Sequence, residues 1–141
     1  MKAPVHLWIV GVLSLVWNAG GAFDYLMVQL QNPDYLAQMT EPQRAYLDTA
    51  PTWFKGTWAI GVWFSVLGSI LLLARSRLAS MAFGLSILGL NASAIYSYGL
   101  ASPSAIDLMG PRAMVMTMAI VVILLCLWSY ARAMKRRGVL R

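Results

Sequence analysis

The chain has 141 residues, of which 60% are hydrophobic and only 11% are charged, and its formal net charge is +6. A soluble domain carries roughly 25% charged residues, so this composition excludes an ordinary water-soluble protein and indicates a single transmembrane domain over residues 1–141. The single cysteine, Cys126, excludes an intramolecular disulfide, and the single histidine, His6, excludes metal or haem sites built from several histidines.

Four apolar segments follow one another along the chain, at residues 4–30, 51–74, 78–100 and 111–134. Each is longer than the ~20 residues that a helix needs to cross a hydrocarbon core of about 30 Å. Backbone polar groups in lipid must be satisfied within the segment, so each is predicted to be a helix. The predicted fold is an all-α, integral membrane four-helix bundle.

The first apolar segment also has features of a secretory signal peptide, since Lys2 precedes an apolar run that ends in small residues at 19–22. A signal peptide has a shorter apolar run and a more strongly charged start, and here helical character resumes after the small residues. We therefore expect the first span to remain in the mature protein.

Residues 31–50 carry two helix-start signals. Asn32 followed by Pro33 can cap one short helix, and residues 40–43 match a capping box for another. The segment is predicted to form a short extracytoplasmic helical cap between the first two spans; a mobile loop is the alternative. The side chains expected to face inward are Tyr35, Leu36, Tyr46 and Leu47.

The distribution of basic residues predicts the orientation. Eight of the 11 lie on the side that holds both termini and the 75–77 loop, and Arg44, Lys55 and Arg112 lie on the other side. Because Lys and Arg accumulate on the cytoplasmic side, we expect a multi-pass protein of the bacterial inner (plasma) membrane with cytoplasmic N- and C-termini. The basic C-terminal tail is expected to attract anionic lipid rather than nucleic acid.

Polar residues inside the spans form two predicted layers. With a rise of 1.5 Å per residue, Asn18 and Asn91 lie roughly 20 Å from the cytoplasmic face and are expected to contact each other. Asp24 lies roughly 29–30 Å from that face, at the depth of Lys55, Tyr98 and Arg112. Asp24 is expected to face the bundle interior and to pair with a cation, Lys55 before Arg112.

Two interpretations of these polar residues remain open. They can serve as interhelical contacts, together with stripes of small residues such as Gly61, Ser65 and Gly68 that let helices approach closely. Alternatively, they line an outward-facing polar pocket, because ionisable residues within spans are candidates for functional sites. The candidate ligand-binding or buried polar residues are Asn18, Asp24, Tyr25, Lys55, Asn91, Tyr98 and Arg112.

No motif for a catalytic site, a metal site or a phosphate-binding loop is present in the sequence, so we expect no catalytic residue and no cofactor. Most aromatic residues lie near the predicted interfaces, as in an aromatic belt. Trp17 and Trp63 lie deeper and are the better candidates for an aromatic ligand cage.

Four stretches carry a resemblance to a known group. They are N-x-x-G-x-x-D-Y at residues 18–25, YLAQMTEPQRAYL at 35–47, PTWFKGTWAIGVW at 51–63 and YARAMKRRGVLR at 130–141. Together the chain resembles small uncharacterised four-helix bacterial inner-membrane proteins, some of which are automatically labelled "sugar transporter". The resemblance implies a four-helix membrane protein and brings no functional residues with it.

The leading hypothesis is a non-enzymatic inner-membrane protein that binds a small molecule or lipid in the outward-facing pocket, as a small transporter. The alternative is an accessory or scaffold subunit of a larger membrane complex, docked through the small-residue stripes. A membrane enzyme is a third hypothesis and would depend on Asp24 alone. The expected partners are the lipid bilayer and, for transport, a second copy in a homodimer.

Overall fold

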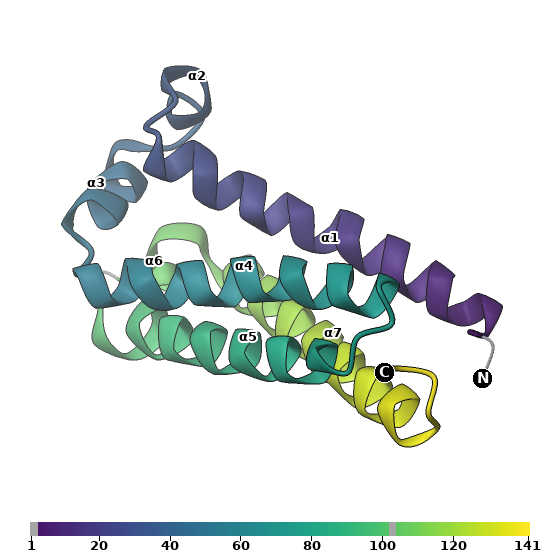
Figure 1. The fold of residues 1–141 in the computed structure, drawn as a ribbon. Coiled ribbons are helices and arrows are strands. Elements are labelled where there is room, and N and C mark those ends of the chain that lie inside the picture. The colour runs from purple at the N-terminus through teal and green to yellow at the C-terminus, as the bar shows by residue number, and fades with distance from the viewer. Residues whose placement is uncertain (1–2, 102–103) are drawn as a thin grey trace.

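The computed structural model describes residues 3–101 and 104–141, and within these residues it is helical with no strand. The elements in Figure 1 are α1 (Val5–Gln29), α2 (Pro33–Leu36), α3 (Glu41–Thr49), α4 (Thr52–Leu73), α5 (Leu78–Ile95), η1 (Tyr96–Leu100), α6 (Ala105–Met109) and α7 (Pro111–Arg136). The prediction of an all-α chain is confirmed for the described residues.

Four helices are long and apolar enough to cross a membrane: Val5–Gln29, Thr52–Leu73, Leu78–Leu100 and Pro111–Arg136. They begin and end within a few residues of the predicted spans. Each exposes large apolar side chains on its surface, for example Val16 (68% exposed), Ile70 (48%), Leu88 (67%) and Val115 (67%). Water-soluble monomers rarely expose apolar patches of this extent, which supports a multi-pass membrane protein.

The four long helices pack in chain order: α1 lies on α4, α4 on α5, and α5 on α7. The closest of these contacts joins α4 to α5. A Cβ atom on Gly89 would lie 2.7 Å from the Gly61 backbone nitrogen and 2.7 Å from the Thr57 carbonyl oxygen. The predicted small-residue stripes are therefore used inside the chain, where they bring two helix backbones together.

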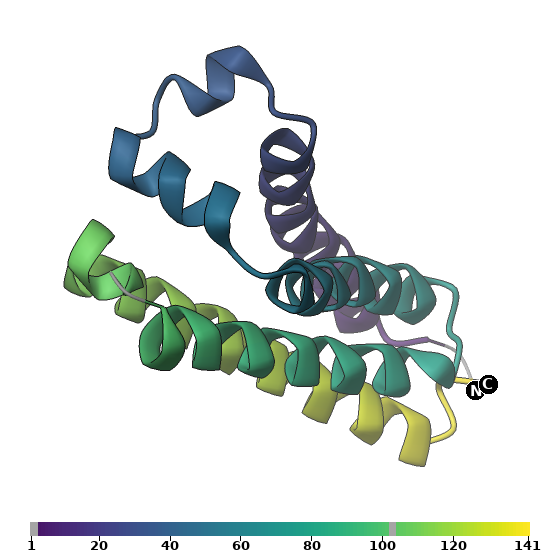
Figure 2. The same ribbon diagram turned by 90° about the vertical axis from the view of Figure 1, so that its left-hand side faces the viewer.

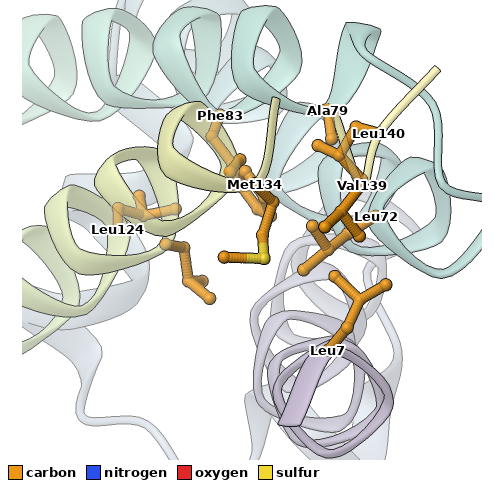
Figure 3. Close-up of a cluster of buried hydrophobic side chains, with 10 residues drawn as sticks. Leu7, Leu72, Ala79, Phe83, Leu124, Met134, Val139 and Leu140 are labelled. Carbon is orange, nitrogen blue, oxygen red and sulfur yellow. The ribbon is translucent and has the colours of Figure 1, made fainter. Parts of the chain in front are cut away.

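A core of apolar side chains closes one end of the bundle, which we call the terminal end because α1 begins there and α7 ends there. Leu7, Leu72, Phe83, Met134 and Val139 are all at most 3% exposed and belong to one cluster (Figure 3). This cluster joins the four long helices to the C-terminal segment.

The C-terminal segment turns back onto the bundle after α7. Gly138 has a φ of 77°, and Val139 N–H donates to the Met134 carbonyl at 3.0 Å, as in a Schellman motif. Arg141 then pairs with the turn between α4 and α5, donating to the Arg75 carbonyl at 2.7 Å and accepting from Arg77 N–H at 3.0 Å. The turn and the tail thus seal the terminal end together.

The opposite end, which we call the far end, carries α2, α3, η1 and α6. The two predicted helix starts are confirmed: the Asn32 side chain accepts from Tyr35 N–H at 3.0 Å, and Thr40 forms a capping box with Gln43. Helix α6 was not predicted, and it begins with a capping box between Ser104 and Asp107. Figure 2 shows that α1 diverges from α5 and α7 toward the far end.

Candidate functional site

A cavity of ≈ 580 Å³ lies at the far end, where α1 diverges from α5 and α7. At the terminal end α1 and α7 meet instead, through a hydrogen bond between His6 Nδ1 and the Tyr130 hydroxyl. The polar side chains in the cavity wall are Asp24, Gln43, Tyr46, Ser93, Ser97, Tyr98, Arg112 and Thr117. Most of the remaining wall is apolar, including Val28, Leu47, Phe54, Trp58, Leu90, Met116 and Ile120.

Asp24 lies in this wall and accepts a hydrogen bond from the Tyr35 hydroxyl of α2. The predicted ion pair with Lys55 or Arg112 is wrong, because the only salt bridge among the described residues joins Arg44 to Glu41 at 3.2 Å. The depth of a residue along a helix does not determine the direction in which its side chain points. Arg112 reaches the same cavity as Asp24, whereas Lys55 is not part of the wall.

Gly20 and Gly21, which precede Asp24, do not bring another helix close to α1. A Cβ atom on Gly20 would meet nothing within 4 Å, and one on Gly21 would meet only Val62 at 3.7 Å. The close approach is made elsewhere, between α4 and α5.

A π-helical turn places two side chains in the cavity. In η1 the Ala101 N–H donates to the Tyr96 carbonyl at 2.8 Å, a five-residue step. Ser97 and Tyr98, which lie in this wider turn, both line the cavity, whereas Asn91, which precedes the turn, is exposed. π-Turns of this kind are rare and are frequently found at functional sites.

Hydroxyl groups from different elements bond across the cavity wall. Tyr98 and Thr117 hydroxyls lie 2.7 Å apart, joining η1 to α7, and the Tyr46 hydroxyl donates to Ser97 Oγ at 2.9 Å, joining α3 to η1. Burial raises the pKa of the Tyr46 phenol above its ordinary value, and this effect outweighs the hydrogen bond with Ser97, which lowers it. Tyr46 therefore stays a neutral donor well into the alkaline range.

An aromatic cluster supports the same region. The ring of Phe54 lies 4.6 Å from that of Tyr96, 6.1 Å from Trp58 and 6.2 Å from Tyr46, measured between centroids. Aromatic contacts of this kind add stability beyond the area they bury. The cluster fixes α3 against α4 and η1.

Asn18 lies outside the cavity, in the interface between α1 and α4. Its Nδ2 donates to the Ser65 carbonyl at 3.1 Å and to Ser69 Oγ at 2.9 Å, and Ser69 Oγ lies 2.8 Å from Ser14 Oγ. The predicted contact with Asn91 is wrong, because Asn18 faces the second span and Asn91 is exposed on the third. Asn18 thus belongs to an interhelical network.

The remaining sequence candidates also lie apart from the cavity. Tyr25 packs edge-on against Trp58 and Trp63, with ring centroids 4.9 and 6.4 Å away. Trp17 and Trp63 are exposed, and neither lines the cavity. Of the seven candidate residues, the structure brings Asp24, Tyr98 and Arg112 together in one wall.

Sequence reasoning missed several residues of the wall. Phe54 and Trp58 are four positions apart, as are Ser93 and Ser97, so helical spacing could have placed each pair on one face. Tyr46 was expected to face inward, and its partner Ser97 was not identified. Among the described residues, no group of three or more His, Cys, Asp or Glu side chains could hold a metal ion.

No protein-family model, curated protein or solved structure matches this chain. The interpretation of the cavity therefore depends on its own geometry. An apolar wall with a few hydroxyls, one carboxylate and one guanidinium suits a molecule with an apolar body and a small polar part.

Proposed function

We propose that the protein is a non-enzymatic, multi-pass protein of the bacterial inner membrane that binds a small molecule or a lipid in the far-end cavity and acts as a small transporter. The observation that carries this proposal is the cavity itself. Its volume of ≈ 580 Å³ lies within the range of about 300–1,000 Å³ that is typical of small-molecule sites. Its wall combines apolar side chains with a few convergent polar groups, as such sites do.

Two charged side chains in the wall favour a ligand with a polar part. Asp24 accepts a hydrogen bond from Tyr35, and Arg112 has no salt bridge to a described carboxylate. A guanidinium offers five donors, so Arg112 is available to a ligand oxygen. The apolar side chains deeper in the wall, such as Leu90 and Ile120, suit the rest of the molecule.

The orientation that we propose makes the cavity face outward. The basic residues near the terminal end favour a cytoplasmic location for both termini, so the far end faces the periplasm. Helices α2 and α3 then form an extracytoplasmic cap. The hydrogen bonds from Tyr35 to Asp24 and from Tyr46 to Ser97 support this role, because they tie both short helices to the spans.

Transport would require the terminal end to open in turn. There Leu7, Leu72 and Met134 pack in a closed core. Four spans offer few elements that could move against one another, so we propose that a transporting unit is a homodimer.

The alternative function is an accessory or scaffold subunit of a larger membrane complex. A subunit of this kind would dock its partner through the stripes of small residues, which would then have to be free. In the structure Gly61, Gly68 and Gly89 are buried and packed against side chains or backbone of the same chain. The alternative therefore has less support than ligand binding.

Cysteine labelling tests whether the cavity opens outward. Ala94 lines the cavity, and its neighbour Ile95 is 62% exposed at nearly the same depth. In a Cys126→Ser background, Ala94→Cys should react in spheroplasts with a membrane-impermeant maleimide, and Ile95→Cys, which faces lipid, should not. Failure of Ala94→Cys to react, or equal reaction at the two positions, would contradict an outward-facing cavity.

A further inference from the structure

A second cavity, of ≈ 870 Å³, lies between α5 and α7 near the terminal end. Four basic side chains line it: Arg77 at the start of α5 and Arg132, Lys135 and Arg136 in the last turns of α7. All four are exposed. We call this the basic groove, and it shares no lining residue with the far-end cavity.

The positive charge of the basic groove is not compensated by acidic side chains. The chain has five acidic residues, which lie in α1, α2, α3 and α6, and none of them lines the groove. Among the described residues, the groove's four cations form no salt bridge. The guanidinium carbon of Arg132 instead lies 4.8 Å from the centroid of the Trp128 ring. This cation–π contact holds one charge at the edge of the groove.

Apart from Ser80, the rest of the groove is mostly apolar, and it extends toward the middle of the bundle. Its wall continues along α5 to Leu88 and along α7 to Leu125, both of which are exposed. From Arg77 to Leu88 the helical rise is roughly 16 Å, which is about half of a 30 Å hydrocarbon core. The groove therefore spans the depth of one leaflet, with charge at the membrane surface and an apolar surface beneath it.

We propose that the basic groove binds an anionic phospholipid of the leaflet at the terminal end. The phosphate lies among Arg132, Lys135 and Arg136, where guanidinium groups can make paired, charge-assisted hydrogen bonds to its oxygens. An acyl chain lies along the apolar wall formed by Leu88 and Leu125. Basic pockets between membrane helices suit such head groups because the lipid supplies both the anion and the apolar chain.

Native mass spectrometry of the full-length protein in mild detergent tests this proposal. The probes are phosphatidylglycerol and phosphatidylcholine with identical acyl chains. We expect the anionic lipid to remain bound at concentrations at least about tenfold lower than the zwitterionic lipid. Equal retention of the two lipids by the wild-type protein would overturn the proposal without any variant.

A matched pair of variants separates the groove from the general charge of this end. The variant Arg132→Gln/Arg136→Gln removes two charges from the groove, and Arg137→Gln/Arg141→Gln removes two from the same end outside it. The first should weaken phosphatidylglycerol binding about 25-fold, at roughly fivefold for each charge, and the second should change it little. Equal weakening by both variants would overturn the proposal.

A third measurement distinguishes the lipid from free phosphate. Inorganic phosphate in excess should leave bound phosphatidylglycerol in place, because the acyl chain in the groove contributes to binding. Complete displacement by inorganic phosphate would show that the groove binds free phosphate and that the lipid proposal is wrong.

Discussion

The Tyr35 hydroxyl donates a hydrogen bond to the Asp24 carboxylate, and this contact joins α2 to the far end of α1. The partner of this carboxylate in the first span is thus a neutral donor from a short helix rather than a cation. Arg112, in the same cavity wall, keeps its donors for other partners. The position of α2 is thus linked to the cavity, because Tyr35 of α2 bonds to Asp24 while the Arg112 guanidinium in the same wall has no salt bridge.

Tyr35→Phe should loosen α2 and α3. A hydrogen bond to a charged group contributes about 1.5–3 kcal/mol, and partial exposure places the expected loss of stability near the lower end, at about 1–2 kcal/mol. Thermal unfolding in detergent measures this loss, and hydrogen exchange should become faster at residues 33–49. Tyr25→Phe is the control, because the Tyr25 ring keeps its packing against Trp58 and Trp63. If Tyr35→Phe and Tyr25→Phe had the same thermal stability and the same hydrogen exchange, the hydrogen bond from Tyr35 to Asp24 would not stabilise the protein.

Asn18→Ala should destabilise the interface between α1 and α4. It removes two hydrogen bonds, to the Ser65 carbonyl and to Ser69 Oγ, and such bonds in membranes contribute ~0.6–2 kcal/mol each. The expected loss of stability is about 1–4 kcal/mol, measured by thermal unfolding in detergent. Asn91→Ala provides the matched control at similar depth, and it should change little because Asn91 is exposed. A larger loss of stability for Asn91→Ala than for Asn18→Ala would contradict the packing of α1 and α5 described above.

The two asparagines show which part of the site could be predicted. Counting residues gives the depth of a side chain, because the helical rise is constant. Whether two side chains at one depth meet depends on the rotation of each helix and on which helices are neighbours. Asn18 and Asn91 are at one depth but on helices that do not pack together, since α4 lies between α1 and α5. Asp24 and Lys55 also lie at one depth, and their helices α1 and α4 do pack together, but only Asp24 lines the cavity.

Gly89→Ala should destabilise the contact between α4 and α5. Its added Cβ atom would lie 2.7 Å from backbone atoms of α4, which cannot give way as a flexible side chain can. We expect a loss of about 1–3 kcal/mol, as for overpacking in a core. Gly20→Ala is the matched control, because nothing lies within 4 Å of its Cβ position. That change should be neutral or stabilising by up to about 1 kcal/mol, because Ala favours a helix. Equal destabilisation in thermal unfolding would rule out the close approach.

Local signals explain how well the helices could be predicted. Long apolar runs and proline or capping patterns gave the four spans and both short helices, because each signal acts over a few neighbouring residues. Helix α6 follows the same rule, and the Ser104–Asp107 pattern could have identified it. The π-turn of η1 has no comparable sequence signal. Helical spacing from Ser93 could have placed Ser97 in the wall, but Tyr98, the next residue, could not be assigned to the same wall in advance.

Reporter fusions should place Arg141 and Gln38 on opposite sides of the membrane. Gln38 lies between α2 and α3 at the far end, and Arg141 pairs with the turn between α4 and α5 at the terminal end. The bias of basic residues toward the terminal end predicts a cytoplasmic reporter at Arg141 and a periplasmic one at Gln38. The reverse result would make the cavity face the cytoplasm.

Mass spectrometry of the molecules that copurify with the protein in mild detergent tests the central claim most directly. Ala94→Trp fills the far-end cavity, and Ile95→Trp adds the same ring on the exposed face of α5. We predict that the wild-type protein and Ile95→Trp retain the same small molecule or lipid, that Ala94→Trp loses it, and that all three show similar thermal unfolding. Retention of every copurifying molecule by a folded Ala94→Trp protein would contradict ligand binding in this cavity.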